Sequence, residues 1–148
     1  MNRILIITFA AALGLATGAH AAGNTTPVGL WKTYADDGRT AQSLVRITET
    51  DGRLSGRIEK LLDPAKQDSR CDKCPGDLKG QSLVGLEILH GLRADAADPS
   101  SYSGGVLVDP ASGRFFRASV KTLEGGQKLQ ARGSIGPLSR AQTWERVE

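Results

Sequence analysis

The sequence predicts an all-β domain, and three observations carry that prediction. Short runs rich in Val, Ile, Leu, Phe and Thr recur at intervals of roughly 8 to 15 residues, the spacing of a β-barrel or sandwich. Turn-forming Gly, Pro and Asp residues separate most of these runs. No stretch keeps the 3.6-residue period of an amphipathic helix for long. The expected fold class is an eight-stranded antiparallel up-and-down barrel.

The predicted strands follow one another along the chain, joined mostly by tight reversals. They are Gly29 to Tyr34, Ser43 to Glu49, Leu54 to Leu62, Leu83 to Leu92, Gly104 to Asp109, Phe115 to Leu123, Lys128 to Ile135 and Ala141 to Arg146. Turns such as Asp51-Gly52 and Gly136-Pro137 supply positive φ or fixed φ where a strand reverses. Most gaps are too short for parallel crossovers, so sequence neighbours should pair antiparallel. Closure of the sheet then removes both exposed edges.

Partial alternation within the strands predicts which face is hidden. Leu54, Gly56 and Ile58 share one face, and the polar residues between them share the other. The residues expected to point into the barrel are Val45, Ile47, Ile58, Ile88, Val106, Leu107 and Phe116. An outer-membrane barrel would need a broad apolar outer band and aromatic girdles. With aromatic residues at 5%, the sequence predicts a charged, wet outer surface instead.

The N-terminus has the three-part pattern of a cleavable secretion signal. Arg3 precedes the apolar run Ile4 to Leu15, and small residues lead to Ala19-His20-Ala21, which predicts cleavage after Ala21. The run is shorter than the roughly 20 apolar residues of a transmembrane helix. We therefore expect a signal peptide over residues 1–21, a flexible leader over 22–28, and one soluble barrel domain over 29–148. The expected location is the periplasm or the outside of the cell.

Charge and composition argue against nucleic-acid binding. The net charge of the 148-residue chain is only +3, and its basic residues form no block. Nucleic-acid binders cluster Lys and Arg on one face and often stack bases on aromatic rings. No nucleic-acid partner is therefore expected.

The long connection from Asp63 to Ser82 departs from the pattern of tight turns and holds both cysteines. A loop of this length is commonly functional or carries its own staple. An oxidising compartment favours a disulfide between Cys71 and Cys74. Two alternatives remain open, a redox or regulatory pair and a metal site. The redox motif lacks its usual βαβ context, and zinc needs more ligands than two sulfurs and His90 provide.

Three patterns that look catalytic predict no enzyme. Gly80-Gln81-Ser82-Leu83-Val84-Gly85 has one residue too many for a nucleophile elbow and lacks the strand-turn-helix context. His90 has no orienting partner that the sequence identifies. Glu87 and His90 have the Glu-x-x-His spacing of di-iron bundles, but in a strand these two side chains should face opposite sides. We expect no catalytic residue, no metal and no cofactor.

Two tryptophans lie in the first and last predicted strands, which are neighbours in a closed barrel. Trp31 and Trp144 are therefore expected at the same end of the core, where an arginine such as Arg140 stacks on an indole face. Two roles remain open for them, a buried plug of the core and part of a ligand site.

Several segments together resemble a known bacterial family. They are Gly29-Leu30-Trp31, Gly52 to Ile58, Cys71 to Asp77, Gly85 to Leu89, Gly104 to Pro110 with Gly113, Leu129 to Gly133, and Gln142 to Trp144. Their order and spacing resemble the domain of unknown function 2147, a family of secreted proteins similar in fold to lipocalins. Two departures are Tyr102, where the family usually has Trp, and Ser139-Arg140-Ala141, which replaces a Gly-Arg-Thr step.

This resemblance implies a lipocalin-like barrel but no agreed activity. By analogy of fold, we expect a binding protein that holds a small apolar or amphiphilic ligand in the mouth of the barrel. The candidate ligand or barrel-end residues are Trp31, Trp144, Arg140, Phe116 and Tyr102. The alternative is a non-enzymatic envelope protein that binds another protein through the barrel rim and the cysteine loop.

Overall fold

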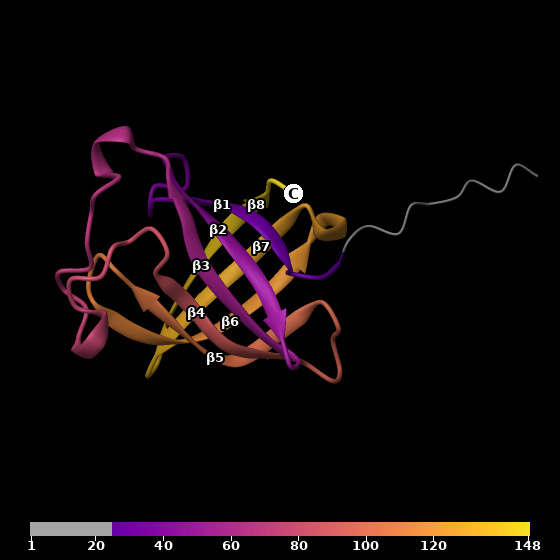
Figure 1. Ribbon diagram of the computed structural model, residues 1–148. Coiled ribbons are helices and arrows are strands. Elements are labelled where there is room, and N and C mark those ends of the chain that lie inside the picture. Colours follow the sequence, from indigo (N-terminus) through magenta and orange to yellow (C-terminus); the bar gives the residue numbers. More distant parts are fainter. Residues whose placement is uncertain (1–24) are drawn as a thin grey trace, which may run out of the picture.

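The computed structural model describes residues 25–148, so the predicted signal peptide and its cleavage site lie outside the described residues. Eight strands form a closed barrel in which each strand pairs antiparallel with its neighbours along the chain (Figure 1). They are β1 (Gly29–Tyr34), β2 (Ala41–Thr50), β3 (Arg53–Leu61), β4 (Glu87–Ala94), β5 (Ser101–Asp109), β6 (Arg114–Leu123), β7 (Lys128–Ile135) and β8 (Leu138–Arg146). The predicted eight-stranded up-and-down barrel is confirmed.

Three strands begin at least three residues away from the predicted position, and the other boundaries agree to within two residues. β4 begins at Glu87 rather than at residue 83, because residues 83–86 turn back and Leu86 O accepts from Ile58 N on β3. β5 begins three residues earlier than expected, with a register shift between Tyr102 and Gly105. β8 also begins three residues earlier, because Gly136-Pro137 alone forms the turn from β7. Residues 124–126 and two segments of the long loop form single 3₁₀ turns.

Apolar side chains, including both tryptophans, fill the barrel. The side chains with an exposure of 2% or less include Trp31, Val45, Ile47, Leu54, Leu89, Leu92 and Leu129. Trp144 and Val120 are 3% and 2% exposed. No described buried side-chain nitrogen or oxygen lacks a hydrogen-bond partner. Both tryptophans therefore belong to the core.

The barrel has two different ends. Residues 25–28 and the chain's C-terminal residues lie at one, which we call the leader end, and the long loop over residues 62–86 lies at the other, which we call the loop end (Figure 1). At the leader end, Trp31 Nε1 donates to Pro27 O at 2.7 Å. Thr122 Oγ1 donates to Thr25 O at 2.7 Å. These bonds hold the leader against β1 and β6.

Arg146 closes the leader end. Its guanidinium lies 4.2 Å from the centre of the Trp31 ring and donates to the carbonyls of Gly126, Val28 and Thr26 at 2.5, 2.9 and 2.5 Å. Burial lowers the pKa of Arg146, but a guanidinium keeps its charge in proteins. Gly29 permits this approach, since a Cβ there would lie 2.5 Å from Arg146 Nη1.

The arginine on the indole face is thus Arg146, and Arg140 lies elsewhere. Arg140 pairs across β7 with Gly133 and reaches Asp36 in the β1–β2 loop at 3.5 Å. β8 runs toward the leader end from Arg140 to Arg146, so the two arginines are six positions apart along the strand. The side chains of Arg140 and Asp36 are 78% and 73% exposed.

Replacing Arg146 with alanine is expected to lower the free energy of unfolding by about 3 kcal/mol, because three carbonyls lose a charged donor and Trp31 loses its cation. Arg140→Ala, on the same strand, should cost no more than about 0.5 kcal/mol, as exposed ion pairs contribute little. Urea unfolding of both variants measures the difference. Equal losses would contradict the role of Arg146 in closing the barrel.

Candidate binding groove beside the cysteine loop

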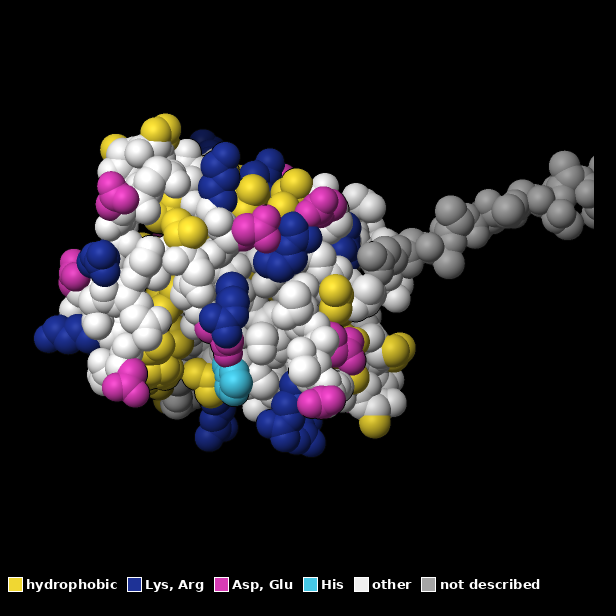
Figure 2. Space-filling model, in the orientation of Figure 1, with side chains coloured by type: hydrophobic (Ala, Val, Ile, Leu, Met, Phe, Trp, Pro, Cys, Tyr) yellow, Lys and Arg dark blue, Asp and Glu magenta, His cyan; other side chains and the backbone are white. Residues whose placement is uncertain are grey.

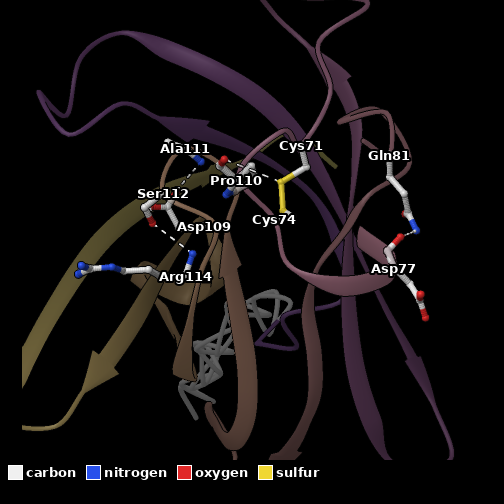
Figure 3. Close-up of a disulfide and its surroundings, with 9 residues drawn as sticks. All are labelled: Cys71, Cys74, Asp77, Gln81, Asp109, Pro110, Ala111, Ser112 and Arg114. Atoms are coloured by element: carbon white, nitrogen blue, oxygen red, sulfur yellow. Dashed lines mark hydrogen bonds between the residues drawn. A yellow bond between two sulfur atoms is a disulfide. The ribbon is translucent and has the colours of Figure 1, made fainter. Parts of the chain in front are cut away.

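The cysteine loop, defined as residues 62–86, connects β3 to β4 and is stapled near its centre. Cys71 and Cys74 form a disulfide, so neither cysteine of the chain is free (Figure 3). Both are buried, at 0% and 2% exposure, and belong to the same apolar cluster as Ile88 and Val108. The predicted disulfide is confirmed. Its two sulfurs pack as part of the protein's core.

Backbone hydrogen bonds fold the loop back on itself around the disulfide. Cys71 N donates to Gln81 O at 2.8 Å, and Gly80 N donates to Cys71 O at 3.0 Å. Arg70 and Ser82 form an isolated antiparallel bridge next to these bonds. The loop is therefore a compact, ordered unit.

The turn between β5 and β6 clamps the loop from the other side. Cys71 Sγ lies 3.8 Å from Pro110 O (Figure 3). Asp109 shapes this turn by accepting from Ala111 N and Ser112 Oγ at 3.0 and 2.6 Å. Gly113, with φ of 72°, lies so close to the loop that a Cβ would come within 1.8 Å of Lys73 O. Only glycine fits this contact.

Gly113→Ala should therefore displace the cysteine loop. Gly38→Ala is the matched control, because Gly38 has a similar φ of 66° and open space around its Cβ position. The control should lose about 1 kcal/mol from backbone strain alone, and Gly113→Ala at least about 1 kcal/mol more from the overlap with Lys73. Limited proteolysis should cut Gly113→Ala within residues 62–86 and spare the control. Equal cleavage would show that the clamp does not order the loop.

Burial of both sulfurs should make the disulfide resistant to reduction in the native protein. Thiol titration after incubation with reductant is expected to find no free thiol without denaturant and two in urea. The double substitution of Cys71 and Cys74 by alanine should cost about 2 kcal/mol, because the closed segment is short. Rapid reduction of the folded protein would instead indicate an exposed, exchangeable pair.

The outer face of β4, β5 and β6 carries apolar side chains next to this loop. Leu89 points inward, so its neighbour His90 points outward, as does Val106, which pairs with His90. Val106 was expected inside and is 40% exposed. The reason is strand alternation, since Leu107 occupies the inward position beside it.

The cysteine loop covers part of this outer apolar face. Val108 lies two residues beyond Val106 on the same face, yet it is only 6% exposed. Its partner on β6, Phe115, is 43% exposed. Leu78 of the loop packs against the core cluster that contains Val108. A partly covered apolar strip therefore runs along the outside of the barrel.

Between the loop and these strands lies a groove of about 520 Å³. Ile88, Val106, Val108, Phe115 and Leu78 give it an apolar surface, and Arg57, Glu87, His90 and Gln81 give it a polar edge. Figure 2 shows apolar side chains exposed in a hollow beside the histidine on this face of the molecule. An apolar surface with a polar edge is suited to a molecule that has both parts.

A β-bulge builds the polar edge. Arg57 pairs with Glu87, but the adjacent Gly56 pairs with Leu89, so Ile88 is an extra residue in β4. The bulge brings Glu87 and His90 to the same side, and Glu87 Oε1 bonds His90 Nδ1. The expectation that these side chains face opposite sides was wrong, because it assumed unbroken alternation. Arg57 Nη2 donates to the other oxygen of Glu87.

A second, smaller hollow adjoins the groove. It has a volume of about 360 Å³, and Arg57, Val84 and Gly85 line the part nearest the loop. Arg46 and Glu59 line its far side and form an ion pair at 2.8 Å, which lowers the pKa of Glu59. Arg57 lines both hollows.

Within residues 25–148, no group of three or more His, Cys, Asp or Glu side chains is placed to hold a metal ion. In the same part of the chain, no helix has the length and hydrophobicity needed to span a bilayer. His90 has an orienting carboxylate, which the sequence did not reveal.

Comparison with known families identifies the chain. A family model described as an uncharacterized protein conserved in bacteria, DUF2147, matches residues 29–146. The chain belongs to this family. A comparison with curated proteins gives no match.

One solved structure extends the comparison of this DUF2147 protein. It is protein HP1028 from the human pathogen Helicobacter pylori, described as belonging to the lipocalin family. The identity is 22%, the TM-score is 0.69, and the match covers 82% of each chain. At this identity the similarity shows the fold, which is that of a lipocalin-like barrel.

In this DUF2147 chain, the residues predicted as ligand contacts lie apart from the groove. Trp31 and Trp144 are buried in the core. Tyr102 is partly buried and pairs with Val120 in the half of the barrel nearer the leader end, while Phe116 pairs with Leu107 in the other half. None of them, nor Arg140, lines the groove. One feature of the sequence could have indicated the groove. Phe115 and Phe116 are adjacent in a strand, so only one of them can face inward and the other must lie on the outer surface.

Proposed function

We propose that this DUF2147 protein is a periplasmic or secreted binding protein that holds one small amphiphilic molecule in the groove beside the cysteine loop. The observation that carries the proposal is the partly exposed apolar strip, because Val106 and Phe115 stay open to solvent between a covered floor and a polar edge. The volume of the groove, about 520 Å³, falls in the range of roughly 300 to 1,000 Å³ that small-molecule sites occupy.

The location differs from the mouth of the barrel, where the sequence led us to expect the ligand. Bulky side chains occupy the inside, including both tryptophans and Leu129. A ligand there would have to displace close-packed groups, and loss of their contacts is costly. The outer groove requires no such rearrangement, which favours it.

The disulfide and the predicted secretion signal agree with a location outside the cytoplasm. Disulfides persist in the periplasm and in secreted proteins and are rare in the reducing cytoplasm. The cysteine loop contributes Leu78 and Gln81 to the groove, so the same oxidising conditions that keep the loop stapled keep the groove formed.

The alternative of a protein-interaction module would use the same loop together with the barrel rim. Ile135 and Leu138 at the tip of the β7–β8 hairpin are 42% and 68% exposed, which makes this rim partly apolar. Neither residue lines the groove or the smaller hollow beside it, so we favour the small ligand.

Titration calorimetry with ten-carbon amphiphiles below their critical micelle concentration tests the proposal. The wild-type protein should bind at least one of them with a single site. Phe115→Ser and Val106→Ser should each weaken binding about tenfold, in line with the apolar area lost. Leu138→Ser, at an even more exposed apolar position outside the groove, serves as the control. Trp fluorescence is a poor reporter because both indoles are buried away from the groove.

Absence of binding by every amphiphile, or equal effects in the groove and control variants, would overturn this function. The three substitutions replace solvent-exposed apolar side chains, so the domain should remain folded, and circular dichroism provides the check.

A further inference from the structure

We infer that the groove selects an amphiphile whose headgroup is uncharged and carries hydroxyl groups, of the monoacylglycerol class, over a fatty-acid anion of the same chain length. This inference rests on the proposed function. It follows from how Arg57, Glu87 and His90 share their charges and hydrogen bonds at the edge of the groove.

Glu87 is the most shielded member of this trio. Its side chain is 22% exposed, compared with 60% for Arg57 and 71% for His90. The negative charge therefore lies deepest in the polar edge, and the cationic group of Arg57 lies further out. A headgroup bound in the groove therefore lies beside a partly enclosed carboxylate.

Arg57 is already committed to groups of the protein. Its Nη2 donates to Glu87, and its Nη1 donates to Gly85 O at 3.3 Å. A ligand carboxylate would have to compete with Glu87 for this guanidinium while lying close to the charge of Glu87. Like charges in a partly enclosed site repel more strongly than in bulk water, so the edge disfavours an anion.

The same trio offers hydrogen bonds to a neutral head. Glu87 carries no proton to donate when ionised, so His90 Nδ1 is the donor in their hydrogen bond. In neutral imidazole the other nitrogen, Nε2, is then an acceptor, and it accepts well from a hydroxyl. On the loop side, Gln81 Nε2 donates to Asp77 O at 2.8 Å, which fixes the amide at the opposite wall (Figure 3).

The test compares 1-decanoylglycerol with decanoate by titration calorimetry near neutral pH, both below their critical micelle concentrations. The wild-type protein should bind the glycerol ester at least about tenfold more tightly. In Glu87→Gln the repulsive charge is gone and Arg57 is released, so the preference should fall several-fold through a gain in decanoate binding. Glu145→Gln, at the β1–β8 seam outside the groove, should keep the wild-type preference.

Each outcome decides between the two claims. Equal or tighter binding of decanoate by the wild-type protein overturns the headgroup inference and leaves the proposed function standing. A preference that Glu87→Gln leaves unchanged also overturns it, because Glu87 is then not the selecting charge. Failure of both compounds to bind, together with the rest of the ten-carbon panel, overturns the proposed function itself.

Discussion

Closure of β8 onto β1 is the contact on which the rest of the structure depends. The two strands pair at only two positions, Trp31 with Arg146 and Lys32 with Glu145, whereas β7 and β8 pair along eight. Side chains strengthen this short seam from both faces. Arg146 crosses Trp31 on the inside, and on the outside Tyr34 Oη donates to Glu145, which raises the pKa of Tyr34. A closed barrel leaves no long edge exposed.

The two ends of the barrel divide the tasks of stability and binding. At the leader end, one half-buried arginine satisfies three carbonyls and covers the core. At the loop end, the β5–β6 turn packs against a disulfide-closed loop whose inner side packs on the core and whose flank forms a groove. Because the disulfide and the close contact of Gly113 with Lys73 both fix the segment from Cys71 to Cys74, the groove can remain open to solvent without loosening the barrel.

Sequence reasoning located the strands, the pairing order and the disulfide, because these depend on alternation, turn residues and short-range cysteine spacing. It failed for features that depend on how one strand pairs with another. The bulge at Ile88 exists only through the pairing of β4 with β3, so no local pattern in residues 83–92 revealed that Glu87 and His90 share a side. Arg146 was missed as the partner of Trp31 for the same reason, since the register at the seam brings them together across 115 positions.

The position of Val106 links that failure to function. Val106 was assigned to the interior because apolar side chains in strands are usually buried. The neighbouring Leu107 occupies the inward position instead, so Val106 points outward. An outward Val106 beside Val108 and Phe115 then requires another cover. The cysteine loop covers Val108 and stops short of the other two, so apolar surface remains exposed next to a charged trio. Exposed apolar surface next to such a polar edge commonly marks an interaction site, and a ligand that completes the cover would bury what the loop leaves open.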